Sequence, residues 1–149
     1  MREEQLRQYF LGKVSANELA EDVYGSVVQV DDVISTVQIT DMRDSFLLIR
    51  PHIVRLCDDF LNRALSPEAL NTVAFALMAS DTFEWDDDVI SEVLSDWSAP
   101  EINYELNGET ISMHRQWLLG STKPSHREAA SPHATATGHL IFSRTKASG

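Results

Sequence analysis

The stretch PHIVRLCDDFLNRALSPEALNTVAFALM, residues 51–78, carries the pattern that decides the fold. Its first half repeats apolar side chains at the i, i+3, i+4, i+7 spacing of an amphipathic helix. That face comprises Ile53, Leu56, Cys57, Phe60, Leu61 and Ala64. Ser66-Pro67-Glu68 then supplies a side-chain cap, a preset first turn and a carboxylate at the positive end of a helix dipole. The second helix should bury Leu70, Val73, Ala74, Leu77 and Met78. Because the connection is very short, we predict an antiparallel helical hairpin.

Towards the N-terminus, LRQYFLGKVSANELAEDV (residues 6–23) predicts two further short helices. The first places Leu6, Tyr9 and Phe10 on one side and stops at Gly12. Ser15 and Glu18 have the spacing of a capping box, in which each side chain accepts a hydrogen bond from the other residue's backbone N–H. The second helix should bury Leu19 and Val23, with Tyr24 as a further candidate.

Residues 26–40, SVVQVDDVISTVQIT, fit two structures. The many β-branched side chains favour a strand. However, Val27, Val30, Ile34 and Val37 also share a helical face. We favour extended structure, with a small hairpin that turns at Asp31-Asp32.

Towards the C-terminus, the three aspartates 86–88 precede a helix that presents Val89, Ile90, Val93, Leu94 and Trp97, and Pro100 limits its continuation. The next segment has two interpretations. Asn107-Gly108 can turn a β-hairpin, or Asn107 can cap a last helix that Gly120 ends. The spacing of Ile111, Trp117 and Leu118 favours the helix.

The C-terminal segment, residues 120–149, differs from the rest of the chain. It is rich in Ser, Thr, Ala, Pro and His and has one short apolar patch at Leu140-Ile141-Phe142. Such a composition buries too little apolar surface to offset its ordering entropy. We therefore predict a mainly α, single small domain of about five to six helices over residues 1–119, with a short β-hairpin near 26–40, followed by a flexible tail over 120–149.

Charge is divided unevenly along the chain. Residues 1–119 hold 22 acidic and eight basic side chains, a net charge of −14, whereas residues 120–149 have a net charge of +3. Between Arg63 and Arg115 there are 11 acidic residues and neither Lys nor Arg. A field of this sign repels nucleic acid and anionic membranes and attracts a basic protein partner.

Further features bear on the compartment. No apolar run reaches the roughly 18 residues that a membrane span requires. The N-terminal MREEQLRQYF lacks the apolar segment of a secretory signal. Cys57 is the single cysteine, which excludes an internal disulfide and fits a reducing cytosol. We expect a cytoplasmic protein.

The segment FEWDDDVISEVLSDWSAPEINYE, residues 83–105, gathers eight carboxylates around large aromatic side chains. It does not fit a calcium loop, because oxygen ligands do not alternate from Asp81 onward and the central glycine is missing. We expect neither a metal nor a cofactor. Interfaces concentrate binding energy in aromatic anchors within a charged rim. The candidate partner-binding residues are therefore Asp81, Glu84, Trp85, Asp86, Asp87, Asp88, Glu92, Asp96, Glu101 and Tyr104, with Trp85 and Tyr104 as anchors.

Catalytic motifs are missing from the sequence. It contains no Gly-rich phosphate loop, no His-Glu-x-x-His and no nucleophile elbow. Cys57 lies on an apolar helical face, where a cysteine is usually a small core residue. A carboxylate-dependent enzyme would need two or more acids that converge in a pocket. We expect a protein that is not an enzyme.

The layout of LRQYFLGKVSANELAEDV and the acidic, aromatic middle resembles bacterial self-protective colicin-like immunity proteins, over residues 1–119. The resemblance implies a small helical cytoplasmic protein that binds a toxin domain, typically a nuclease, and blocks its active site. It also implies that carboxylates mimic the phosphates of the toxin's substrate. The alternative is a helical adaptor that binds a housekeeping partner through apolar surface. Salt dependence of binding separates the two.

Overall fold

The structure is a computed structural model, and it describes residues 1–29, 34–101, 103–120 and 139–145. For 27–29, 34–36 and 139–145 the description covers the backbone only. The elements follow in the order α1 (Glu3–Phe10), α2 (Ala16–Ser26), β1 (Val27–Gln29), β2 (Ile34–Thr40), β3 (Phe46–Leu47), α3 (Arg50–Leu61), α4 (Pro67–Met78), β4 (Phe83–Glu84), α5 (Asp88–Ser98), α6 (Gly108–Leu118) and β5 (His139–Thr145).

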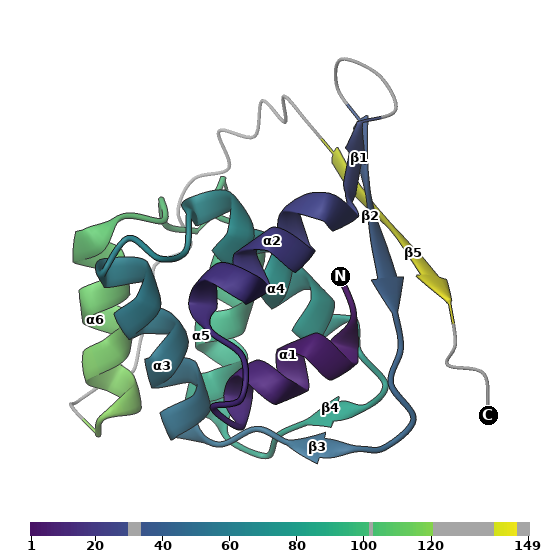
Figure 1. Cartoon of the computed structure of the whole chain (residues 1–149). Coiled ribbons are helices and arrows are strands. Elements are labelled where there is room, and N and C mark those ends of the chain that lie inside the picture. Colours follow the sequence, from purple (N-terminus) through teal and green to yellow (C-terminus); the bar gives the residue numbers. More distant parts are fainter. Residues whose placement is uncertain (30–33, 102, 121–138, 146–149) are drawn as a thin grey trace.

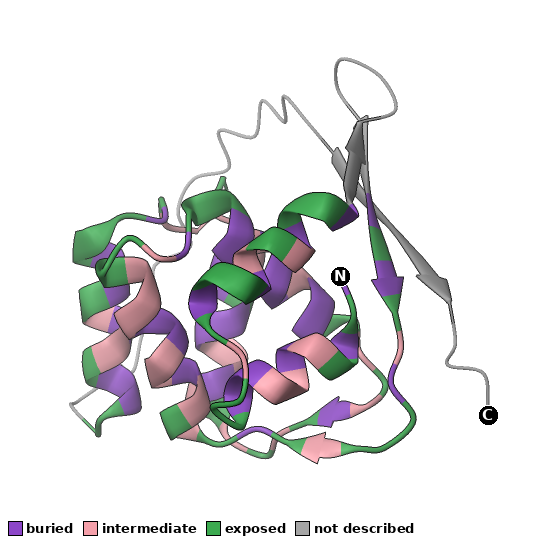
Figure 2. Ribbon diagram, in the orientation of Figure 1, coloured by how far each residue is buried: buried purple, intermediate pink, exposed green. Residues whose placement is uncertain are grey.

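The described residues form a mainly helical domain with six helices, as the sequence predicts. A three-stranded sheet lies beside α2, and the two-stranded sheet of β3 and β4 lies near α1 (Figure 1). The helices turn buried residues towards the interior of the domain and exposed residues towards solvent (Figure 2). Trp97 and Tyr9 are the largest side chains that are fully buried.

The local capping signals are confirmed. The Ser66 hydroxyl accepts a hydrogen bond from the backbone N–H of Ala69 at 3.0 Å. The Asn107 side chain accepts one from Thr110 at 2.9 Å, so the segment after it is the helix α6 and not a hairpin. Ser15 and Glu18 make both hydrogen bonds of the capping box, each at 3.2 Å.

Three predictions about the helices are wrong in detail. Helix α4 packs chiefly on α5, and α3 packs chiefly on α6, so α3 and α4 are neighbours in sequence without forming a closely packed pair. Tyr24 is 86% exposed. Leu61 and Met78, the last residues of α3 and α4, are also exposed.

The ambiguous segment 26–40 is largely extended. Strand β1 pairs with β2 in antiparallel fashion, with Val27 opposite Val37, which confirms the predicted hairpin; its turn at Asp31-Asp32 lies outside the described residues. In β2 the alternating side chains of Val37 and Ile39 are buried. Because successive side chains of a strand point to opposite faces, Val37 and Ile39 lie on the same face of β2 and attach the sheet to the helical core.

Strand β5 lies within the segment that we predicted to be a flexible tail. It pairs with β2 in parallel, from Ile34 opposite His139 to Thr40 opposite Thr145. The structure therefore differs from the prediction for residues 139–145. Composition missed this strand because its backbone hydrogen bonds are supplied by a partner strand far away in the sequence. The rest of the tail after Gly120 lies outside the described residues.

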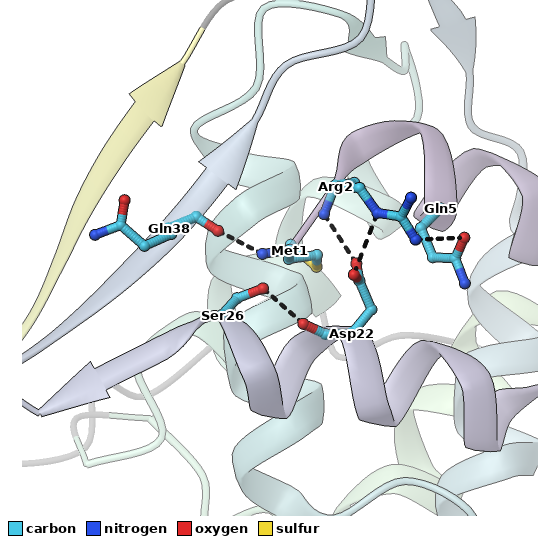
Figure 3. A network of polar contacts seen from close by, with 6 residues as sticks. All are labelled: Met1, Arg2, Gln5, Asp22, Ser26 and Gln38. Atoms are coloured by element: carbon cyan, nitrogen blue, oxygen red, sulfur yellow. Dashed lines mark hydrogen bonds and ion pairs between the residues drawn. The ribbon is translucent and has the colours of Figure 1, made fainter.

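Polar contacts fasten the two residues before α1 between β2 and α2 (Figure 3). The α-amino group of Met1 donates a hydrogen bond to the Gln38 carbonyl. The backbone N–H of Arg2 donates to Asp22 at 2.9 Å, and the Arg2 guanidinium pairs with the same carboxylate at 3.3 Å. Because Asp22 belongs to α2, these contacts set the position of α2 relative to the sheet.

Glu3 is a buried carboxylate, 1% exposed, that holds two loops on α1. Its Oε1 accepts hydrogen bonds from the Met42 backbone N–H at 3.0 Å and from the Thr82 hydroxyl at 2.9 Å. Its Oε2 accepts one from the Ser80 hydroxyl. The loop before β3 and the loop before β4 therefore meet at one side chain.

We expect Glu3→Gln to lower the free energy of unfolding by about 1–3 kcal/mol. The amide NH2 of Gln would face one of the three groups that donate hydrogen bonds to the Glu3 carboxylate, and that hydrogen bond would be lost. Urea denaturation of the full chain measures the change. Glu4→Gln is the matched control, since Glu4 is exposed and pairs only with Arg7 and Gln8 among the contacts seen. Its effect should stay within about 0.5 kcal/mol. Equal effects of the two substitutions would show that the buried network does not support the loops.

Candidate functional site

The predicted acidic segment forms a loop between α4 and α5, and side chains alternate along it. Phe83, Trp85 and Asp87 are buried or half-buried, whereas Glu84, Asp86 and Asp88 are exposed. This alternation follows from the extended backbone that begins at β4. The aromatic residues anchor the loop, and the carboxylates between them face solvent. We call residues 81–88 the acidic loop.

Phe83 provides the first anchor of the acidic loop. Its ring contacts those of Phe46 and Phe10, at centroid distances of 5.7 and 6.0 Å. In the two-stranded sheet, Phe83 is paired with Phe46 and Glu84 with Leu47. Aromatic packing and backbone pairing therefore fix the start of the loop.

Trp85 provides the second anchor. Its indole N–H donates a hydrogen bond to the Ser91 hydroxyl at 2.7 Å, and its ring packs against the core while remaining half-buried. Part of the ring surface thus stays accessible. Trp85 therefore supports the acidic loop, and its predicted role as an anchor for a partner stays a prediction.

Asp87 is held in place by two kinds of contact. It caps α5 by accepting a hydrogen bond from the backbone N–H of Val89 at 2.9 Å. It also receives the Arg50 guanidinium on both oxygens, at 2.6 and 3.2 Å. These hydrogen bonds from Arg50, with the backbone ones, lower the pKa of Asp87 below its usual value. We therefore assign Asp87 to the support of the loop, where it joins the N-terminal ends of α3 and α5.

Four carboxylates of the acidic loop point into solvent. Asp81, Glu84, Asp86 and Asp88 are exposed, and within the part of the chain that the structure describes none has a side-chain hydrogen bond or an ion pair. Arg50 is the cation that reaches this loop, and it is committed to Asp87. Among the described residues, no cation is therefore paired with these four side chains.

The remaining candidate residues do not join this group. Helix α5 spans about 16 Å, so Glu101, beyond its C-terminal end, lies far from Asp88 at its start. Glu92 is half-buried on the helix, and Tyr104 is half-buried with its ring edge-on to His114 at 6.0 Å. The prediction that Asp96 faces a partner is wrong, because this carboxylate is fully buried. The Asp96 carboxylate can be buried because a side chain that hydrogen-bonds to it also lies within the core.

That side chain is His114, on α6. Its Nε2 lies 3.0 Å from Oδ2 of Asp96, and both side chains are inaccessible to solvent. Its Nδ1 accepts a hydrogen bond from the indole N–H of Trp97, also at 3.0 Å. Because Nδ1 uses its lone pair for Trp97, the ring is neutral and carries its proton on Nε2, which donates to the Asp96 carboxylate.

The electrostatics of His114 agree with this neutral state. Burial lowers its pKa to about 4, and the negative charge of Glu92 raises it by a smaller amount. The rings of Tyr104 and Trp117 also pack edge-on against the imidazole. A histidine and a carboxylate at this distance are a common catalytic pair. Here no substrate can reach them, so the pair acts as a structural link between α5 and α6.

Sequence reasoning missed this link, although a signal was present. Asp96 follows Val93 by three residues and precedes Trp97, so it falls inside the apolar stripe of α5. His114 lies between Ile111 and Leu118 on the apolar stripe of α6. Two ionisable residues on buried stripes predict that each needs a polar partner in the core.

Three other features bear on chemistry. The prediction that Cys57 is a core residue is confirmed, and burial raises the pKa of its thiol to about 12. Across the described ranges, no three His, Cys, Asp or Glu side chains are placed to hold a metal ion. Among the same residues, no helix combines the length and the apolar character of a membrane span.

Comparison of the chain with protein-family models, with curated proteins and with solved structures gave no match. The assignment of a function therefore depends on the geometry and charge described above.

Proposed function

We propose that this protein is a non-catalytic binding protein whose acidic loop docks on the basic surface of a partner protein. The observation that carries the proposal is the set of four exposed carboxylates on one loop, Asp81, Glu84, Asp86 and Asp88, without a paired cation in the described part of the chain. The partner class that we favour is a bacterial toxin domain of the nuclease type. The protein would then act as its immunity protein in the cytoplasm.

The support of the loop favours this role. Phe83, Trp85 and Asp87 each hold it against the helical core. A binding surface that is already ordered loses less conformational entropy when it associates. The carboxylates can therefore face a row of Lys and Arg side chains without rearrangement of the backbone.

The charge of the partner follows from the same features. A nuclease binds phosphates through basic side chains, and carboxylates held on a rigid loop offer a similar pattern of negative charge. Complementary charge raises the rate of encounter and selects the partner. Binding over such a site would exclude the nucleic acid, so inhibition would need one molecule of this protein for each toxin domain and no turnover.

Reversal of the loop charges tests this proposal. We expect Glu84→Lys/Asp86→Lys/Asp88→Lys to slow association with the partner about tenfold at low salt and to flatten its salt dependence. Asp87 is left unchanged because it supports the fold. Stopped-flow fluorescence of Trp85 measures the rate.

The matched control is Glu101→Lys/Glu105→Lys/Glu109→Lys, which changes the net charge equally at exposed positions between α5 and α6 and in the first turn of α6. An equal decrease in rate for both variants would show that net charge, and not the acidic loop, governs encounter. That result would overturn the proposed site.

Identification of the partner uses the same pair of variants as bait. The wild-type protein and the control variant should each retain one basic protein from the cells that encode them, and the loop variant should lose it. The retained protein is then assayed for cleavage of DNA and RNA, with and without an equimolar amount of this protein. A partner without nuclease activity, or one whose activity persists at equimolar ratio, contradicts the immunity role.

A second candidate function, a helical adaptor for a housekeeping partner, is favoured by a different surface. A groove of about 960 Å³ lies between α2 and α4, with Val23 and Ala69 in its lining and Tyr24 exposed at its border. An adaptor would bind through this apolar area, and its affinity would change little between about 50 and 200 mM salt. A large decrease over that range favours the acidic loop.

A further inference from the structure

A cleft of about 280 Å³ lies beside the acidic loop, between the start of α3 and the end of α6. Its apolar lining comes from Pro51 and Val54 on α3 and from Leu118 and Leu119 on α6. An apolar cavity of about 150 Å³ can hold a benzene ring. The cleft is therefore large enough for one large apolar side chain of a partner.

One residue that lines this cleft is a strongly exposed apolar side chain, and two further exposed apolar residues precede α3 in the chain. Leu119 is 59% exposed and forms part of the lining, and Ile49 is 47% exposed directly before Arg50. Leu47, 59% exposed, follows on β3. Single exposed apolar residues are normal on a protein surface. Leu119 differs, because it is a strongly exposed apolar side chain in the wall of an apolar cleft, which is more typical of a site that a partner covers.

Arg50 connects the cleft to the acidic loop. It lines the cleft, donates a hydrogen bond to the carbonyl of Trp117 at 3.4 Å and pairs with Asp87 at 2.6 Å. On the other side, the backbone N–H of Leu48 donates to the Glu84 carbonyl at 2.8 Å. Leu47 is also opposite Glu84 in the two-stranded sheet. Arg50 thus joins the cleft to Asp87 of the acidic loop, and the pairing of β3 with β4 places Leu47 beside Glu84.

The two arginines that line the cleft already have hydrogen-bond acceptors within the protein. The guanidinium of Arg50 is held by Asp87, and that of Arg55 donates to the carbonyls of Tyr9 and Val14. Arg55 also lies over the Tyr9 ring, 4.0 Å from its centroid. These contacts leave the arginines poorly placed to take an anionic ligand. Asp58 also lines the cleft and pairs with Arg115 at 2.6 Å. The exposed carboxylates Glu84, Asp86 and Asp88 of the acidic loop are therefore the charges that a cationic partner can pair with beside the cleft.

We propose that this cleft receives an apolar side chain from a basic, amphipathic segment of the partner protein, while Lys or Arg side chains of the same segment pair with Glu84, Asp86 and Asp88. The inference rests on the proposed function and adds the anchor of the interface. Apolar contact would supply the slow dissociation, and the carboxylates would supply the fast encounter. In this interface the cleft belongs to this protein, and the apolar side chain that fills the cleft belongs to the partner.

The test uses two synthetic helical peptides of equal length and equal positive charge. In one, Leu residues follow the i, i+3, i+4, i+7 spacing, and in the other the same positions are Ser. Fluorescence anisotropy gives the dissociation constants at about 50 and 200 mM salt. We expect the Leu peptide to bind about tenfold more tightly than the Ser peptide. Ile49→Ser/Leu119→Ser should remove this tenfold difference. Tyr24→Ser, at the groove between α2 and α4, should preserve it.

Each other outcome identifies what fails. If both peptides bind alike and only the charge-reversed loop variant weakens them, the cleft inference is overturned and the acidic loop stands. If Tyr24→Ser removes the preference for the Leu peptide, the occupant binds in the other groove and the inference is again overturned. If neither peptide binds at about 50 mM salt, the proposed function and the inference fail together. Thermal unfolding by circular dichroism checks that Ile49→Ser/Leu119→Ser is folded, as expected for two exposed positions.

Discussion

Replacement of His114 by Ala should lower the free energy of unfolding by about 3–5 kcal/mol, the largest effect that we expect for any single substitution in this chain. The imidazole supplies a donor to Asp96 and an acceptor to Trp97. Without it, a buried carboxylate loses a close partner and a buried indole N–H has no acceptor. The cost of taking a hydrogen bond from a buried carboxylate and from a buried indole N–H exceeds that of the small cavity that is left.

Urea denaturation followed by Trp fluorescence measures this effect. His52→Ala is the matched control, since His52 is only half-buried and its Nδ1 accepts one hydrogen bond from the Ile49 backbone. It should cost about 1 kcal/mol. The double variant Asp96→Leu/His114→Leu should recover much of the stability, because it removes both polar partners together. If His114→Ala and His52→Ala cost the same, the buried pair is not the link between α5 and α6 that we describe.

Acid should destabilise the protein through the same histidine. The pKa of His114 is lowered from 6.5 to about 4 in the folded state. Between these values the unfolded chain binds more protons than the folded one, so the free energy of unfolding falls as the pH falls. The contribution is fully present above about pH 6.5 and lost below about pH 4. The shift corresponds to about 3 kcal/mol in total.

A difference experiment isolates the contribution of the Asp96–His114 pair, because the other carboxylates that titrate in acid are present in both proteins. The stability of the wild type and of Asp96→Leu/His114→Leu is measured from pH 7 to pH 4. We expect the wild type to lose about 3 kcal/mol relative to the double variant. His52, whose pKa is also lowered by burial, is present in both proteins and cancels. Parallel stability curves would show that His114 titrates alike in both states.

The buried pair also explains why the acidic surface is smaller than the sequence indicates. From the residues alone, ten side chains between 81 and 104 are equivalent candidates for one contact surface. The structure removes Asp96 to the core, assigns Asp87 to Arg50 and places Glu101 at the other end of α5. The four exposed carboxylates of the loop remain as a group. A cleft that the sequence did not indicate lies next to them.

Features that depend on near neighbours in the chain were determined by the sequence itself. The caps at Ser15, Ser66 and Asn107 act across three residues, and the apolar stripes of the helices act across three or four. The β-branched run before Thr40 likewise favours strand within its own length. These preferences are local, so they can be derived from spacing and residue type alone.

Only the tertiary structure decided the contacts between distant residues. His114 meets Asp96 across 18 positions, Arg50 meets Asp87 across 37, and β5 pairs with β2 from the far end of the chain. The sequence does not distinguish an exposed carboxylate from a buried one. The environment of a carboxylate on a helix depends on which other helix packs against that helix. The packing of α6 on α3 and α5 therefore decides which of the acidic residues can meet a partner.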